Sequence, residues 1–192
     1  MQDVMKGLSR RGALGVGAMM GGAGLVGAQP ALGMDNGAKG EFGFLAGHWR
    51  VRHRKLNHRL AGDTTWREFE GTTRGWIAMD GEGSFDDNVL DDPAGAYRAV
   101  TFRRRDPVTR HWAIWWFDGR VSGTNIDPPV VGSFKDGVGT FLAPDTFEGK
   151  PILTRFIWSR ITANSAQWEQ AFSPDRGETW ETNWTMTFER VA

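Results

Sequence analysis

The residues best suited to acid–base chemistry lie on three segments with alternating side chains. His53 follows Trp49 and Val51 at a spacing of two, so these three side chains share one face of an extended strand. A histidine with an unperturbed pKa of about 6.5 suits proton transfer at neutral pH. Glu70 and Asp87 lie on the next two alternating segments. If all three side chains point into one interior, His53 would act with Asp87 or Glu70 as acid and base. This arrangement predicts a cofactor-independent lyase, isomerase or hydratase.

Each of these residues also has a simpler interpretation. A single interior histidine is more often a satisfied core residue, and alternating carboxylates often form a solvated outer face. The facing depends on register, because strand side chains alternate with a period of two. A slip of one residue in the second segment turns Glu70 outward and brings Phe69 inward. Catalysis is therefore one of two functional hypotheses, beside the third interpretation of a structural or envelope-stress protein without a ligand.

The aromatic residues favour the other hypothesis, which is binding of a small molecule. The densest aromatic run is Trp112–Phe117, with the sequence WAIWWF. An aromatic-lined sheet with few interior polar groups is typical of pockets for apolar or aromatic ligands. Arg120 opens the connection Gly119–Pro129, where its guanidinium could orient a carboxylate or phenolate on the ligand. The predicted ligand-binding residues are Trp49, His53, Glu70, Asp87, Trp115 and Arg120.

The sequence gives little support to other kinds of site. It has no cysteine and no His-x-His or His-x-x-x-His pair, so we predict no metal site. A Gly-x-Ser-x-Gly nucleophile elbow is also missing. Haem held by His53 or His111 is the one cofactor alternative that the histidines leave open. We predict no cofactor.

These residues are positioned by a succession of predicted strands. Alternation predicts ten of them, at residues 49–57, 65–76, 83–90, 97–104, 111–118, 130–135, 138–142, 152–161, 166–173 and 179–190. Short turns such as Asp136-Gly137 join most of them, and only Gly119–Pro129 is a long connection. Consecutive hairpins predict an all-β fold, a closed antiparallel up-and-down barrel of about ten strands.

Two stretches of the chain resemble lipocalin-like (calycin) barrels. Phe44-Leu45-Ala46-Gly47-His48-Trp49 resembles their first strand, which a Gly-x-Trp motif opens. The segment 168–180, WEQAFSPDRGETW, resembles a terminal hairpin of uncharacterised bacterial exported families of this type. The resemblance covers most of residues 42–190. It implies a calycin-like barrel in which Trp49 plugs the closed end, and it fixes no function.

The N-terminus has the composition of an export signal. Lys6, Arg10 and Arg11 form a basic head before a Gly-rich, uncharged stretch, and Ser9-Arg10-Arg11 resembles a twin-arginine motif. We expect a signal peptide at 1–28, cleaved after Ala28 or Gly33, a flexible lead-in at 29–41 and a barrel domain at 42–192. The mature protein would then be periplasmic or secreted.

Charge and surface patterning limit the partners. Of 23 basic and 23 acidic residues, 20 and 22 remain after residue 28, a net charge of −2. This balance argues against nucleic acid and against an anionic membrane as partners, and we expect no membrane insertion after cleavage. Both faces of Trp112–Phe117 are apolar, so one of them must be covered. A second copy of the chain, in a homodimer through this strand, or another segment of the same chain would cover that face equally well.

Overall fold

The computed structural model describes residues 40–121 and 126–191. The expected signal peptide at 1–28 and most of the expected lead-in at 29–41 lie outside the described residues. Two 3₁₀ turns, η1 (Gly43–Leu45) and η2 (Met79–Gly81), accompany ten strands. The strands are β1 (Gly47–Leu56), β2 (Trp66–Ala78), β3 (Gly83–Leu90), β4 (Tyr97–Arg105), β5 (Trp112–Asp118), β6 (Val130–Lys135), β7 (Val138–Phe147), β8 (Lys150–Ser159), β9 (Ser165–Ser173) and β10 (Glu181–Arg190). Within the described part, no helix has the length and apolar character to cross a membrane.

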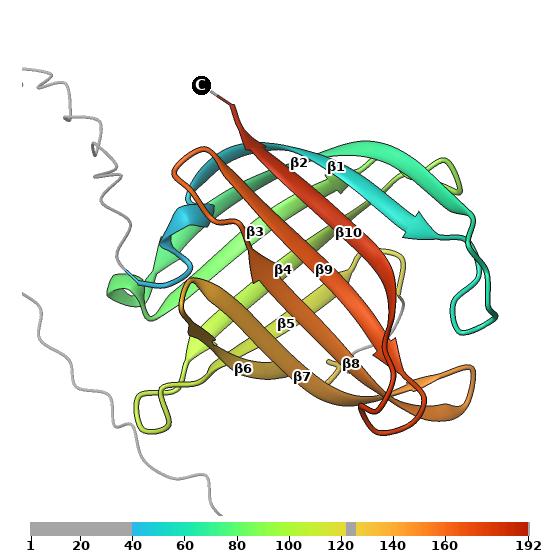
Figure 1. Ribbon diagram of the computed structural model, residues 1–192. Helices are drawn as coiled ribbons and strands as arrows, with labels where there is room; N and C mark the ends of the chain where they lie inside the picture. The colour runs from blue at the N-terminus through green and yellow to red at the C-terminus, as the bar shows by residue number, and fades with distance from the viewer. Residues whose placement is uncertain (1–39, 122–125, 192) are drawn as a thin grey trace, which may run out of the picture. The chain divides into compact units, whose positions relative to one another are not determined.

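The ten strands form one closed antiparallel barrel, which confirms the predicted fold. Each strand pairs with the next along the chain, and β10 pairs back with β1 (Figure 1). Closure pairs every strand on both sides, although β6 pairs with only part of β5 and of β7. Because the strands simply alternate in direction, connections fall in two groups, one at each end of the barrel.

The strand boundaries agree with the predicted ones except around the β7–β8 hairpin. We expected β7 to end at Leu142, but β7 continues through Pro144 to Phe147. Residues 143–147 pair with β8, whereas β6 pairs with β7 only up to Leu142. Pro144 therefore lies where β7 has no β6 partner, which is a strand position that tolerates proline.

The end of the barrel that carries the start of β1 is closed by η1. Phe42 packs edge-on against Trp112 and Trp158, at ring-centroid distances of 4.9 and 6.2 Å. At the same end the Trp49 side chain is 1 % exposed, and its Nε1 donates to the Leu45 carbonyl oxygen at 3.0 Å. A Cβ on Gly75 would lie 2.2 Å from that same oxygen, so only glycine permits this close approach.

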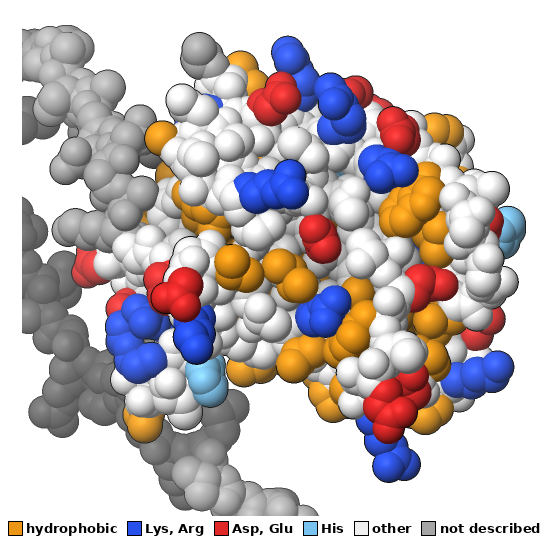
Figure 2. Space-filling view, viewed as in Figure 1, with side chains coloured by type: hydrophobic (Ala, Val, Ile, Leu, Met, Phe, Trp, Pro, Cys, Tyr) orange, Lys and Arg blue, Asp and Glu red, His pale blue; other side chains and the backbone are white. Residues whose placement is uncertain are grey.

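The outer surface carries cations and anions interspersed, with hydrophobic side chains between them (Figure 2). Between β1 and β2 the pairs Arg52–Glu70 and Arg54–Glu68 lie at 3.5 and 2.8 Å. Such exposed pairs contribute little to stability. They show which face of β2 is solvated.

The side chains of β5 face the opposite way from the prediction that Trp115 lines the ligand site. Trp112, Ile114 and Trp116 point inward, and Trp115 and Phe117 point outward. The outward tryptophan extends a row of register partners that crosses four strands. This outer aromatic row consists of Trp76, Phe85, Phe102 and Trp115.

Candidate functional site

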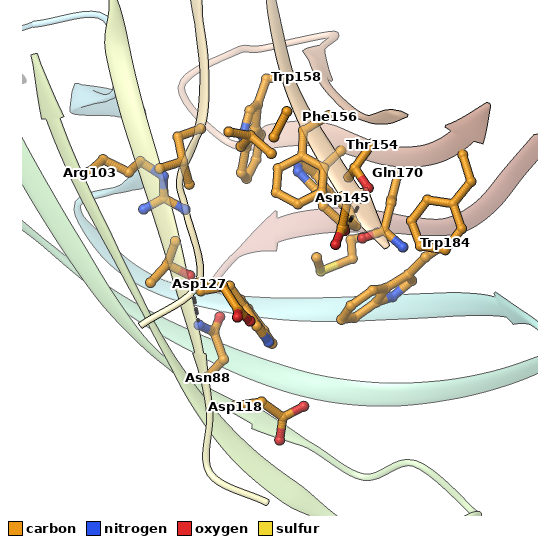
Figure 3. A pocket seen from close by; sticks show the side chains of 18 of the residues that line it. Asn88, Arg103, Asp118, Asp127, Asp145, Thr154, Phe156, Trp158, Gln170 and Trp184 are labelled. Atoms are coloured by element: carbon orange, nitrogen blue, oxygen red, sulfur yellow. Dashed lines mark hydrogen bonds between the residues drawn. The ribbon is translucent and has the colours of Figure 1, made fainter. Parts of the chain in front are cut away.

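The barrel encloses a cavity of about 350 Å³ (Figure 3). Aromatic side chains from four strands form much of its wall: Trp116, Phe156, Trp158, Trp168, Trp184 and Phe188. This confirms an aromatic interior. The wall also carries eight side chains that are charged at their ordinary pKa values, namely Lys55, Arg59, Asp86, Arg103, Asp118, Arg120, Asp127 and Asp145. The expectation of few interior polar groups is therefore wrong.

The predicted acid–base residues are not brought together. His53 is buried inside the barrel, but Glu70 lies on the outer face with Arg52. Asp87 also faces outward and pairs with Arg98. The structure has the alternative facing of β2, in which a shift of one residue turns Glu70 outward and Phe69 inward. Phe69 is buried and stacks on His53, with the ring centroids 4.7 Å apart. Nothing in this arrangement joins His53 to a carboxylate in one acid–base pair.

The remaining predicted ligand-binding residues are divided between the wall, the closed end and the outside. Arg120 lines the cavity as expected. Trp49 is buried at the closed end, outside the cavity lining. Trp115 packs on Phe102 on the outer face at 5.7 Å, and its neighbour Trp116 lines the cavity in its place.

His53 is a buried, neutral core histidine. Its Nδ1 accepts a hydrogen bond from Trp184 Nε1 at 3.2 Å, so the ring proton resides on Nε2. Burial, and then the nearby Lys55, lower the pKa of His53 to about 3. The imidazole therefore does not exchange protons near neutral pH, and the simpler interpretation of this residue holds.

Acid should destabilise the barrel through His53. Its pKa is about 6.5 in the unfolded chain and about 3 in the fold, so the stabilisation is complete above pH 6.5 and is lost as pH falls toward 3. We expect a loss of about 2 kcal/mol between pH 7 and pH 5 from this group, at roughly 1.4 kcal/mol per pH unit. Urea unfolding at both pH values measures it. His53→Gln should show a smaller loss, whereas His58→Gln, an exposed control, should match wild type.

A cluster of basic side chains lies at the open end of the cavity. Lys55 is buried, with its Nζ 3.0 Å from Tyr97 Oη, 3.9 Å from Asp92 Oδ2 and 3.7 Å from the Trp184 ring centroid. Burial, and then the charge of Arg59, lower the pKa of Lys55 to about 7. Burial also raises the pKa of Tyr97 to about 12, so its phenol stays neutral and keeps its proton to donate.

The positive charge of this cluster exceeds its negative charge. Arg67 makes two hydrogen bonds to Asp92, and Arg120 makes two to Asp118, so these four side chains form two neutral pairs. Burial opposes ionisation of Asp118, but the bonds from Arg120 outweigh it and lower its pKa overall.

Arg59 is the cation left over beside these two pairs. It makes no salt bridge with any described residue, and it lies over the Phe147 and Phe172 rings at 5.9 and 5.7 Å. Burial and the neighbouring cations lower its pKa, although guanidinium remains charged at neutral pH. Lys55 and Arg59 are therefore the two cations of the mouth that no aspartate binds through two hydrogen bonds.

A second polar group lies at the closed end of the cavity, across β2, β3 and β4. Thr73 Oγ1 donates to Asn88 Oδ1 at 2.6 Å, and Asn88 Nδ2 donates to Asp86 Oδ1 at 2.7 Å. The other Asp86 oxygen accepts from Arg103 Nη1. All four side chains are buried, so the network desolvates an ion pair and satisfies its carboxylate completely.

Sequence reasoning missed the polar residues that line the cavity most closely. Lys55 could have been predicted as a cavity residue, because it continues the spacing of Trp49, Val51 and His53. A lysine near the end of a strand, however, suggests a position at the rim of the barrel. Asp86 was hidden by its neighbour Asp87, since in β3 Phe85 and Val89 face outward whereas Asp86 and Asn88 face inward.

Comparison with known proteins bears on the fold. No protein-family model matches the chain, and no curated protein sequence matches it. Among solved structures, the S-type phycobiliprotein lyase CPES from Guillardia theta is similar, with 11% sequence identity and a TM-score of 0.49 over 79% of this chain and 90% of that chain. No activity follows from so distant a likeness. The closed antiparallel barrel, with Trp49 buried behind η1, agrees with the barrel that the Gly-x-Trp resemblance implies.

Proposed function

We propose that this barrel binds a small aromatic molecule that carries an acidic group. The observation that supports the proposal is a cavity of about 350 Å³ with aromatic walls and with Lys55, Arg59 and the Tyr97 hydroxyl together at its mouth. Pockets that are mostly apolar, with a few convergent polar groups, are how proteins bind small ligands. The aromatic rings would hold the body of the ligand in the barrel.

The acidic group is assigned from the charges at the mouth. Besides burial, the charge of Arg59 lowers the pKa of Lys55, and the charges of Arg67 and Arg120 lower the pKa of Arg59. An anion between Lys55 and Arg59 would relieve this repulsion and accept charge-assisted hydrogen bonds. The Tyr97 hydroxyl accepts from Lys55 and can donate its own proton to the same anion. Orientation of an acidic group, the role first expected for Arg120, is thus assigned to its neighbours Lys55, Arg59 and Tyr97.

The proposal is tested with two naphthalene ligands of similar size, one anionic and one neutral. Calorimetric titration should show 2-naphthoate binding at one site per chain and 2-naphthalenemethanol binding at least about 10-fold more weakly, as expected for loss of a charge-assisted bond. Arg59→Gln should weaken 2-naphthoate binding by about 10-fold or more on the same grounds.

Arg98→Gln is the matched control for that titration, because Arg98 pairs with an aspartate on the outer face. It should bind both compounds as wild type does. Equal affinity for the acid and the alcohol, or equal losses in the two arginine variants, would remove the anion from the proposal.

We also propose export by the twin-arginine route, on the Ser9-Arg10-Arg11 motif and the Gly-rich stretch after it. The double variant Arg10→Lys, Arg11→Lys should leave precursor in the cytoplasm, because lysine does not replace the arginine pair. Fractionation and immunoblotting measure the periplasmic yield. An unchanged yield would refute this route and leave general secretion.

A homodimer through the outer face of β5 is a separate proposal. The outer aromatic row, together with exposed Val100 and Phe117, forms an apolar surface that a second copy would cover. Sedimentation velocity of wild type should show a dimer, and Trp115→Glu should show a monomer. A monomeric wild type at micromolar concentration would refute it.

A further inference from the structure

We propose that the closed end of the cavity, at Arg103 and Trp158, is a second recognition site that takes a neutral hydrogen-bond acceptor of the carbonyl class from the ligand. The inference rests on the proposed function and specifies the opposite end of the same molecule. It concerns a part of the cavity far along the barrel axis from Lys55 and Arg59.

Two buried donors at this end lack a partner. Arg103 Nε and Trp158 Nε1 are buried and make no hydrogen bond within the described part of the chain. Both residues line the cavity, and the Arg103 guanidinium carbon lies 5.7 Å from the Trp158 ring centroid. Figure 3 shows the two side chains at the same end of the pocket. A buried donor without an acceptor costs free energy, which an acceptor supplied by a ligand would recover.

The hydroxyl of a third residue has the same property. Ser84 is the register partner of Arg103 on β3, and its Oγ is buried with no partner among the described residues. The Asp86 oxygens both accept hydrogen bonds already, from Asn88 and from Arg103. Ser84 lies outside the cavity lining, as does Glu82, whose Oε2 is also buried without a partner in the described part of the chain. The closed end therefore offers a ligand the two donors of Arg103 and Trp158.

The charge balance decides which acceptor fits. Asp86 neutralises Arg103 within the barrel wall, so the closed end has no excess positive charge. A second carboxylate placed there would be desolvated and repelled by Asp86. A carbonyl oxygen accepts the same donors without that repulsion. The two ends of the cavity thus select an aromatic keto acid or its equivalent, with the acid at the mouth and the carbonyl innermost.

The test uses a pair of probes of nearly equal size. In 6-acetyl-2-naphthoate a carbonyl lies at the far end of the rings from the carboxylate, and in 6-ethyl-2-naphthoate that oxygen is missing. Calorimetry with the full barrel domain should give about 3- to 10-fold tighter binding of the acetyl compound, the range for one or two neutral hydrogen bonds. Trp158→Phe keeps an aromatic ring and removes only the N–H donor, so it should reduce this preference.

Trp180→Phe is the matched control, because Trp180 lies outside the cavity lining and its Nε1 donates to the Gly177 carbonyl oxygen. It should keep the preference. The infrared carbonyl stretch of the bound acetyl group should shift to lower frequency in wild type and in this control, and shift less in Trp158→Phe. Equal affinity of wild type for the two probes, or an unchanged preference in Trp158→Phe, would overturn the inference while leaving acid binding intact. If neither probe bound, the proposed function itself would fail.

Discussion

Replacement of Trp49 by alanine should destabilise the barrel by about 3–5 kcal/mol, in the range for truncation of a large buried aromatic residue. Trp49 is 1 % exposed, packs on Phe188 at 6.2 Å and lies under the Arg190 guanidinium at 4.2 Å. Arg190 in turn donates to the Ala46 and Phe44 carbonyl oxygens, so the ring supports the contacts that hold η1 in place. Chemical denaturation followed by circular dichroism measures the loss.

The matched control for this substitution is Trp115→Ala. Trp115 is a half-buried tryptophan of the outer face whose aromatic partner is Phe102. Its loss should cost about 1 kcal/mol, the usual contribution of an aromatic pair. If the two alanine variants were equally stable, or if Trp49→Ala lost less than Trp115→Ala, Trp49 would not be the plug of the closed end.

Binding of an aromatic acid should weaken steeply above neutral pH. The anion favours protonated Lys55, whose pKa is about 7 in the free protein and must be higher in the complex. The affinity for 2-naphthoate should therefore be constant below about pH 6 and fall by up to about tenfold per pH unit above pH 7. Lys55→Met should abolish this dependence and bind about 10- to 100-fold more weakly at pH 6, as expected for loss of a charged donor.

The controls isolate Lys55 from the other groups at the mouth. Tyr97 titrates at about 12, and Arg59, Arg67 and Arg120 stay charged over this range. Lys135→Met removes an exposed lysine and should retain the wild-type dependence. A flat affinity from pH 6 to 9 in wild type, or the wild-type slope in Lys55→Met, would contradict the role of Lys55.

Much of the fold was predictable because alternation is a local property of the chain. The sequence placed His53 inside correctly, since the Gly-x-Trp motif fixes the facing of β1 through Trp49. No comparable anchor exists in β2 or β3. In β3 the interior takes Asp86 and Asn88 while Phe85 faces outward, so the hydrophobic pattern points the wrong way.

The candidate site was harder to predict because it is built from contacts between strands. Both faces of β5 are apolar, so its alternation could not decide between Trp115 and Trp116. The ion pair of Asp86 with Arg103 joins two strands, and neither residue alone signals a buried partner. Lys55 acquires its lowered pKa from burial and from Arg59, which follows in the next connection.

The most direct test of a ligand-binding barrel is native mass spectrometry of the protein purified from its own cells. Wild type should carry a noncovalent small molecule with an acidic group, released on collisional activation. Ala143→Phe should lack it, because Ala143 is buried in the cavity wall and a phenyl ring there occupies the space of the ligand. Val131→Phe, on the outer surface, should carry the molecule as wild type does. The same adduct on wild type and on Ala143→Phe, or none on any of the three proteins, would contradict the account.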